Sequence, residues 1–275
     1  MKHYLRDFFG GFLIVIIAVA VMKFITLDLR MVTFFIPILL TAYVYFFIKN
    51  RKLKWLSLLL LVLPISIAFY LGILTELPGM WMAILVFLYA AILGYVASIR
   101  KSILFGTVLF AVFSFYMVPG IVEDNLSEYS NEIAPDMQFM SIDNGKMVPL
   151  SAFKGKVLVL DFFGTWCAPC IKEMDELKRV QDYFKDTPNV EIILVCTEQG
   201  GDTPEKVEPF MKKHNLSFKA YFDTGNASHS SLNFSGVPAL VVFDQNGTIR
   251  FKHEGYNPSE NLEKNLIDFI GELIN

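Results

Sequence analysis

The chain has 275 residues, of which 54% are hydrophobic, and the hydrophobic residues are concentrated before residue 123. Residues 1–122 carry ten Lys and Arg against three acidic residues (net +7), whereas residues 123–275 carry 14 against 24 (net −10). The acidic C-terminal region excludes nucleic acid and anionic lipid as its expected partners, because both carry negative charge.

The N-terminal region contains five apolar segments long enough to cross a hydrocarbon core of about 30 Å. They are Phe8 to Leu27, Met31 to Ile48, Leu56 to Leu74, Met80 to Ile99 and Ile103 to Val122. These segments contain no Asp, Glu or His, and Lys23 lies near an end. Proton- and ion-coupled transporters need such groups, so we expect residues 1–122 to form a membrane domain that does not transport ions.

Basic residues are concentrated in alternate loops between these segments. They are Lys2 and Arg6 before the first, Lys49, Arg51, Lys52 and Lys54 between the second and third, and Arg100 and Lys101 between the fourth and fifth. Loops rich in Lys and Arg face the cytoplasm. We therefore expect a cytoplasmic N-terminus and an extracytoplasmic C-terminal domain, periplasmic if the chain lies in a bacterial inner membrane.

Residues 123–132 are polar and acidic and are expected to form a short linker. Residues 133–275 then show strand patterns interleaved with helix patterns, which favours an α/β domain. The expected strands are Val157 to Phe163, Val190 to Thr197, Lys219 to Phe222, Ala239 to Asp244 and Thr248 to His253. Helices are expected at residues 167–184, 204–214 and 259–274, and Asp143-Asn144-Gly145 predicts a hairpin turn.

Two cysteines separated by two residues, in Trp166-Cys167-Ala168-Pro169-Cys170, lie between an expected strand and an expected helix. Unpaired backbone N–H groups and the helix dipole stabilise a thiolate at a helix N-terminus. Cys167 is therefore predicted to be the attacking sulfur of a redox pair, and Cys170, about one turn further along, the resolving sulfur. Pro169 falls in the first turn, where its missing N–H costs nothing.

The same spacing also occurs in zinc sites and in structural disulfides. A four-ligand zinc site needs two more ligands, and the chain offers only Cys196 and four scattered histidines, so we expect no metal site. Cys196 ends an apolar run and is predicted to be a buried core residue without a chemical role. His229 precedes Pro238 in an expected loop and is predicted to lie at the surface, and a place in the lining of the substrate groove is the alternative.

Two segments carry a resemblance to a known family. They are Val159-Leu160-Asp161-Phe162-Phe163-Gly164-Thr165-Trp166-Cys167-Ala168-Pro169-Cys170 and Gly236-Val237-Pro238-Ala239, with support from Ala134-Pro135-Asp136 and from residues 150–156 and 243–247. From Ile133 to Asn275 the chain resembles the TlpA/ResA type of membrane-anchored extracytoplasmic thiol-disulfide oxidoreductase. The resemblance implies a thioredoxin-like α/β fold, a mixed sheet flanked by helices, following the transmembrane helix bundle.

The resemblance also implies roles for individual residues. Pro238 corresponds to the cis-proline that faces the active-site cysteines, Val237 to the residue whose backbone pairs with substrate, and Trp166 to a substrate contact. Asp161 corresponds to a buried acid that exchanges protons with Cys170, although a solvated aspartate at a strand end is the alternative. Ala168 replaces the glutamate of some cytochrome-maturation relatives, which weakens a narrow assignment to cytochrome c maturation.

The expected function is reduction of protein disulfides outside the cytoplasm through the Cys167/Cys170 dithiol. The alternatives are a disulfide oxidase or isomerase, and a non-enzymatic redox-sensing membrane scaffold. The expected partners are protein thiol or disulfide substrates and the lipid bilayer. No cofactor is expected, and because residues 1–122 contain no cysteine, a separate membrane protein is expected to donate the electrons.

Overall fold

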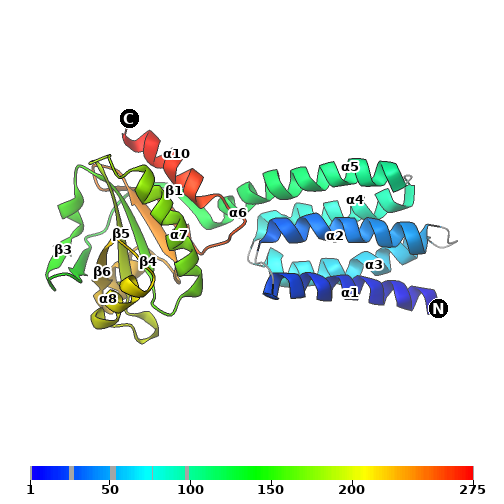
Figure 1. Ribbon diagram of the computed structural model, residues 1–275, viewed down its shortest axis with the longest axis horizontal. Helices are drawn as coiled ribbons and strands as arrows, with labels where there is room; N and C mark the ends of the chain where they lie inside the picture. The colour runs from blue at the N-terminus through cyan, green and yellow to red at the C-terminus, as the bar shows by residue number, and fades with distance from the viewer. Residues whose placement is uncertain (1, 25–27, 50–53, 76, 97–98, 275) are drawn as a thin grey trace. The chain divides into compact units, whose positions relative to one another are not determined.

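The computed structural model describes residues 2–24, 28–49, 54–75, 77–96 and 99–274. The chain forms two compact units (Figure 1). One comprises Met1–Asn125 with Asn257–Glu260, and the other comprises Leu126–Tyr256 with Asn261–Asn275.

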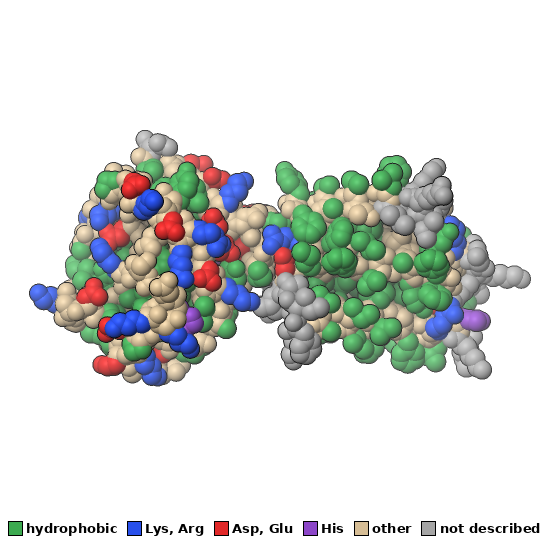
Figure 2. All heavy atoms as spheres, in the orientation of Figure 1, with side chains coloured by type: hydrophobic (Ala, Val, Ile, Leu, Met, Phe, Trp, Pro, Cys, Tyr) green, Lys and Arg blue, Asp and Glu red, His purple; other side chains and the backbone are tan. Residues whose placement is uncertain are grey.

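The first unit consists of long apolar helices. In chain order they are α1 (Lys2–Phe24), α2 (Leu29–Tyr43) with η1 (Val44–Ile48), α3 (Lys54–Phe69) with η2 (Tyr70–Leu74), η3 (Pro78–Trp81) with α4 (Met82–Val96), and α5 (Ile99–Val112) with η4 (Phe113–Met117) and α6 (Val118–Leu126). Figure 2 shows that hydrophobic side chains cover most of the visible face of these helices. A continuous apolar outer face of this kind is typical of helices that contact lipid.

Five segments within the described residues are long and apolar enough to cross a membrane. They are His3–Val21, Leu29–Ile48, Trp55–Leu74, Pro78–Val96 and Leu104–Leu126, so the predicted number is confirmed and the ends differ by a few residues. The expectation that the segments hold no Asp, Glu or His does not hold for the observed bounds, because the first segment includes His3 and Asp7 and the last includes Glu123 and Asp124. Asp7 is buried, with Arg6 Nε 3.8 Å and Tyr43 Oη 3.3 Å from its Oδ1. Arg51 and Lys52, on which the predicted orientation partly rests, lie outside the described residues.

Small residues allow the helices of this unit to approach closely. The hydroxyl of Thr41 on α2 donates to the carbonyl of Ala90 on α4 at 3.1 Å, and a Cβ atom on Gly94 would overlap the carbonyl of Thr41. A Cβ on Gly11 of α1 would likewise overlap the carbonyl of Leu61 on α3. Glycine at these two positions therefore sets the spacing between helix backbones.

The second unit is a mixed sheet with helices. Its strands are β1 (Ser127–Ile133), β2 (Gln138–Ser141), β3 (Met147–Pro149), β4 (Val157–Phe163), β5 (Val190–Thr197), β6 (Lys219–Asp223), β7 (Ala239–Phe243) and β8 (Thr248–Glu254). Its helices are η5 (Leu150–Phe153), α7 (Ala168–Tyr183), η6 (Gln199–Gly201), α8 (Pro204–Lys213), η7 (Thr224–Asn226), α9 (Ala227–Ser231) and α10 (Leu262–Ile274).

Within the described residues the strand order is β1-β8-β7-β4-β5-β6-β2-β3. The pairs β4–β5 and β5–β6 are parallel and the other pairs are antiparallel. Strand β4 lies between β5 and β7 and is buried along its whole length, which explains its unbroken apolar sequence. The loop that carries the cysteines follows this central strand.

Alternate residues of β4 face two different cores. Val157, Val159 and Phe163 pack with buried residues of α7, α8 and α10, whereas Leu158, Leu160 and Phe162 belong to the core on the other face. Because strand side chains alternate, Asp161 points to the same face as Val159 and Phe163, the face covered by α7. The first core therefore contains the cysteines and Asp161 together.

The expected strands are observed, those at residues 157–163 and 190–197 with the same bounds, and the predicted hairpin turn joins β2 to β3. The expected linker at 123–132 is wrong: α6 continues to Leu126, and β1 follows at once and pairs antiparallel with β8. As an edge strand, β1 keeps its acidic side chains in solvent, so a polar sequence is compatible with regular structure there. The last helix begins at Leu262 instead of residue 259, because Ser259 lies in a turn in which Glu260 N–H donates to the Asn257 carbonyl.

Candidate redox-active site

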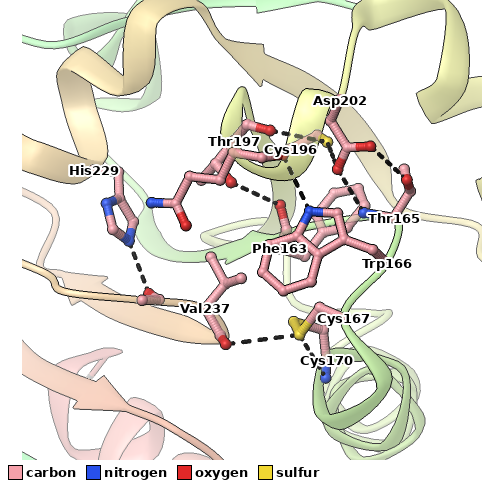
Figure 3. Close-up of a disulfide and its surroundings, with 12 residues drawn as sticks. Phe163, Thr165, Trp166, Cys167, Cys170, Cys196, Thr197, Asp202, His229 and Val237 are labelled. Atoms are coloured by element: carbon pink, nitrogen blue, oxygen red, sulfur yellow. Dashed lines mark hydrogen bonds between the residues drawn. A yellow bond between two sulfur atoms is a disulfide. The ribbon is translucent and has the colours of Figure 1, made fainter.

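Cys167 and Cys170 form a disulfide at the N-terminus of α7, with their Cα atoms 5.4 Å apart (Figure 3). Cys167 is the N-cap residue, and its Sγ accepts a hydrogen bond of 3.2 Å from the backbone N–H of Cys170. Pro169 occupies the first turn, as predicted. Cys167 is 2% exposed and Cys170 is fully buried, so a partner protein reaches Cys167 first.

The loop before β7 faces this disulfide. The peptide bond between Val237 and Pro238 is cis, as the family resemblance implies, and Pro238 is buried. The carbonyl oxygen of Val237 lies 3.7 Å from Cys167 Sγ (Figure 3). In the disulfide the sulfur carries no hydrogen, so this approach is a contact, and in the reduced form the thiol can donate to the same oxygen. The predicted substrate-pairing residue is therefore next to the predicted attacking sulfur.

Trp166 is 54% exposed and borders the disulfide, and its indole Nε1–H donates to the carbonyl of Gln199 at 3.0 Å. A Cβ on Gly200 would overlap the indole, and Gly200 has a φ of +64°, so glycine is required there for both reasons. Trp166 thus has an exposed apolar surface beside the disulfide, and η6 fixes its orientation.

Asp202, which follows η6, holds the loop that carries the cysteines. Its carboxylate accepts hydrogen bonds from the backbone N–H of Thr165 at 2.7 Å and from the Thr165 hydroxyl at 2.5 Å. The thiol of Cys196 lies 3.7 Å from the same carboxylate. Burial and the nearby charge of Asp202 raise the pKa of Cys196, so its thiol stays protonated and unreactive. The prediction that Cys196 is a buried core residue is confirmed.

Asp161 is completely buried, so the alternative of a solvated strand-end aspartate is wrong. Its register partners are Leu194 on β5 and Leu240 on β7, and both are buried apolar residues. Burial raises the pKa of Asp161 well above its ordinary value. A carboxyl group with a raised pKa holds a proton more tightly than an ordinary carboxyl group, so it is suited to take up a proton when ionised and to give it back during the reaction.

Glu173 is a second buried acid in this layer, and sequence reasoning missed it. It lies three residues after Cys170 on α7 and is fully buried together with Met174 and Leu177. Its position was available from the sequence, because residues 170, 173, 174 and 177 follow the spacing of one helix face. The core between α7 and β4 therefore contains two carboxyl groups beside the cysteine pair.

His229 is buried, so the prediction that it lies at the surface is wrong. The helix α9 places its imidazole edge-to-face on Phe162, with ring centroids 5.4 Å apart. Its Nε2 lies 2.8 Å from the carbonyl oxygen of Gly236, the residue before Val237.

Among the described residues, no group of three or more His, Cys, Asp or Glu is arranged to hold a metal ion. The structure brings together at this site the two sulfur atoms, the buried acids and the backbone of the loop before Pro238.

Comparison with known proteins identifies relatives of the C-terminal region. The Redoxin family model matches residues 130–266. Thiol-disulfide oxidoreductase ResA of Bacillus subtilis (strain 168) is 30% identical over 151 residues, which cover 55% of this chain and 80% of the relative. ResA of Bacillus thuringiensis subsp. konkukian (strain 97-27) is 29% identical over 164 residues, covering 60% of this chain and 89% of the relative.

Solved structures match about half of this chain. A thiol:disulfide interchange protein DsbE from Chlorobium tepidum is 24% identical, with a TM-score of 0.45, over 52% of this chain and 99% of that protein. A protein disulfide isomerase from Bacteroides thetaiotaomicron is 27% identical, with a TM-score of 0.45, over 54% of this chain and 92% of that protein. On the evidence of the ResA relatives, together with the cysteine pair on α7, the chain belongs to the ResA-like thiol-disulfide oxidoreductases.

Proposed function

We propose that this enzyme reduces disulfides of protein substrates outside the cytoplasm, with Cys167 as nucleophile and Cys170 as resolving cysteine. The observation that carries the proposal is the position of the Cys167–Cys170 disulfide at the N-terminus of α7, with the Val237 carbonyl 3.7 Å from Cys167 Sγ. The N–H groups of the first helical turn favour the thiolate of Cys167 over that of Cys170, because Cys167 Sγ already accepts one of them.

The reaction moves two electrons from the enzyme to the substrate. The Cys167 thiolate attacks one sulfur of the substrate disulfide, which forms a mixed disulfide and releases the first substrate sulfur as a thiolate. Cys170 then loses its proton and attacks Cys167 Sγ, which releases the second substrate sulfur. The enzyme ends with the Cys167–Cys170 disulfide. Its dithiol has given up two protons, one from Cys167 before the attack and one from Cys170 before resolution, and the two substrate thiolates take up two protons from water.

We assign the proton transfer at Cys170 to Asp161. Support comes from its complete burial, its raised pKa and its place on the face of β4 that packs against α7. In its ionised form, a carboxyl group whose pKa is raised in this way accepts the Cys170 proton as the mixed disulfide is resolved, and it returns the proton when the Cys167–Cys170 disulfide is reduced again.

The substrate is proposed to bind as an extended segment beside Val237. Backbone pairing there places a substrate sulfur over Cys167, and the exposed face of Trp166 contacts the side chains that follow. Recognition through the main chain tolerates many sequences, so unfolded or flexible protein segments are the expected substrates.

Residues 1–122 are proposed to anchor the enzyme in the bacterial inner membrane with the N-terminus in the cytoplasm. Support comes from the five apolar segments and from the Lys and Arg residues of alternate loops. Residues 133–275, the redox domain, then lie in the periplasm.

The membrane segments contain no cysteine, so they cannot pass electrons to Cys167 by thiol exchange. We therefore propose that a separate membrane protein re-reduces the Cys167–Cys170 disulfide. In intact cells a Cys170→Ser variant should accumulate mixed disulfides through Cys167 with both the substrate and this donor. If the variant traps only substrate, although the same cells keep the wild-type enzyme reduced, that result would argue against a separate electron donor.

The direction of the reaction is tested with the purified full-length chain in detergent. The reduction potential of the Cys167/Cys170 pair is measured in thiol buffers, and insulin reduction is measured with dithiothreitol as electron source. A reductase should have a potential closer to about −270 mV, as in thioredoxin, than to about −120 mV, as in DsbA. A Cys167→Ser variant should be inactive, whereas Cys196→Ala serves as a matched cysteine control that keeps activity. A potential near the DsbA value would show that the enzyme is an oxidase.

A further inference from the structure

Gly236, the residue before Val237, is held from two sides. On one side, the carboxylate of Glu254 on β8 accepts hydrogen bonds from Ser235 N–H at 2.8 Å, from the Ser235 hydroxyl at 2.5 Å and from Gly236 N–H at 3.0 Å. On the other side, the Gly236 carbonyl meets His229 Nε2 at 2.8 Å (Figure 3). Both polar groups of Gly236 therefore have partners on other elements of the fold.

His229 is itself rigidly held. The buried carboxylate of Asp223, at the end of β6, accepts hydrogen bonds from the backbone N–H groups of Ser228 and His229 at 3.0 and 2.9 Å. The imidazole packs against Phe162 and Phe234, with ring centroids 5.4 and 5.8 Å away. Because a carbonyl oxygen only accepts hydrogen bonds, the proton of the neutral ring is on Nε2.

The bond to His229 determines where the Val237 N–H points. In a trans peptide the C=O and N–H groups point in opposite directions, so fixing the Gly236 carbonyl on His229 turns the Val237 N–H away from it. In the part of the chain that the structure describes, the Val237 N–H has no hydrogen-bond partner, and the Val237 carbonyl contacts Cys167 Sγ. The N–H and C=O groups of Val237 are thus both presented for pairing with a substrate strand.

We infer that His229 is a positioning residue for substrate binding: it fixes the Gly236–Val237 peptide plane so that the Val237 backbone can pair with an extended substrate. This inference rests on the proposed pairing of substrate with Val237. Packing alone does not account for a histidine here, because leucine would fill an apolar site between two phenylalanine rings without needing a polar partner. The imidazole instead donates its N–H to the one carbonyl whose orientation controls the loop.

The test compares protein and small-molecule substrates of the full-length chain in detergent. Loss of one hydrogen bond changes an equilibrium about 3- to 10-fold. A His229→Leu variant should therefore raise the KM for insulin about 3- to 10-fold and leave kcat within twofold. The rate with oxidised glutathione, which is too short for strand pairing, and the Cys167/Cys170 potential should stay unchanged.

Three further variants separate the hydrogen bond from other effects of the substitution. His229→Gln keeps an N–H donor near the Nε2 position and should restore most of the KM. Glu254 is partly exposed and holds the other side of Gly236, so Glu254→Ala should raise the KM for insulin in the same way. This variant tests the inference if His229→Leu fails to fold. His214→Leu removes a histidine at the end of α8 and should have no effect on either substrate.

An unchanged insulin KM in folded His229→Leu would overturn the inference, as would an equal loss of activity with insulin and glutathione. Failure of the proposed function looks different, because the wild-type enzyme would then oxidise a reduced peptide instead of reducing insulin. In that case the KM for the reduced peptide should show the same dependence on His229, since either direction uses the same backbone pairing.

Discussion

Replacement of Asp161 by asparagine should slow one step of the reaction and stabilise the protein at high pH. The asparagine side chain has nearly the same shape but cannot take up a proton. General acid-base groups contribute about 10²- to 10⁴-fold to rates, and Asp161 is buried among apolar neighbours where water is a poor substitute. Resolution of the mixed disulfide by Cys170 should therefore slow about 100-fold, whereas attack by Cys167 on the substrate should change little.

The effect on stability follows from the raised pKa of Asp161. Burial raises this pKa in the folded state, so the folded protein binds the proton more tightly than the unfolded chain does. The stability is then greatest below the unfolded pKa near 3.8 and falls as the pH rises towards the folded pKa, by about 1.4 kcal/mol for each pH unit between these two pKa values. Asparagine removes this loss, so Asp161→Asn should be more stable than wild type at pH 8 and similar near pH 4.

Cys196 provides the assay for unfolding, because in the oxidised protein it is the free cysteine of the described chain and is buried in β5. The rate at which a thiol reagent labels Cys196 in increasing urea reports unfolding of the sheet for full-length protein in detergent. Rapid acid quenching of the reaction with insulin measures how much mixed disulfide accumulates. Wild-type kinetics in Asp161→Asn, with lower stability at pH 8, would refute the proton-transfer role and assign Asp161 to packing.

Three further outcomes are expected. Asp202→Ala removes both hydrogen bonds that hold Thr165 in the active-site loop. Alkylation of the reduced enzyme by iodoacetamide should therefore slow about 3- to 10-fold, and an unchanged alkylation rate would contradict this. Cys196→Ala should keep insulin reduction within twofold, since burial and Asp202 raise the pKa of the Cys196 thiol, and loss of activity in a folded variant would show a hidden role. An alkaline phosphatase reporter fused after Asn275 should be active and one fused near Arg51 inactive, and the reverse pattern would invert the proposed orientation.

The parts of the fold that follow from the sequence are those in which one local pattern has one structural solution. The run Val157 to Phe163 is apolar at nearly every position because β4 is buried between two strands and under helices on one face. Cys167 and Pro169 fit the start of α7 because an N-cap and a first-turn proline need no tertiary contact to be recognised. The strand β1 was missed because its acidic sequence is acceptable only at the edge of a sheet, and its partner β8 is more than 100 residues away.

The site residues that the sequence did not reveal are those whose function depends on contacts between distant segments. His229 reads as a loop histidine until α9 packs it on Phe162 and the chain returns seven residues later with the Gly236 carbonyl. Glu254 reads as a charged residue at a strand end, yet its carboxylate organises the loop 18 to 19 residues before it. A motif therefore identifies the two sulfurs that carry electrons, whereas the groups that orient the substrate become visible only when the fold shows which backbone atoms they hold.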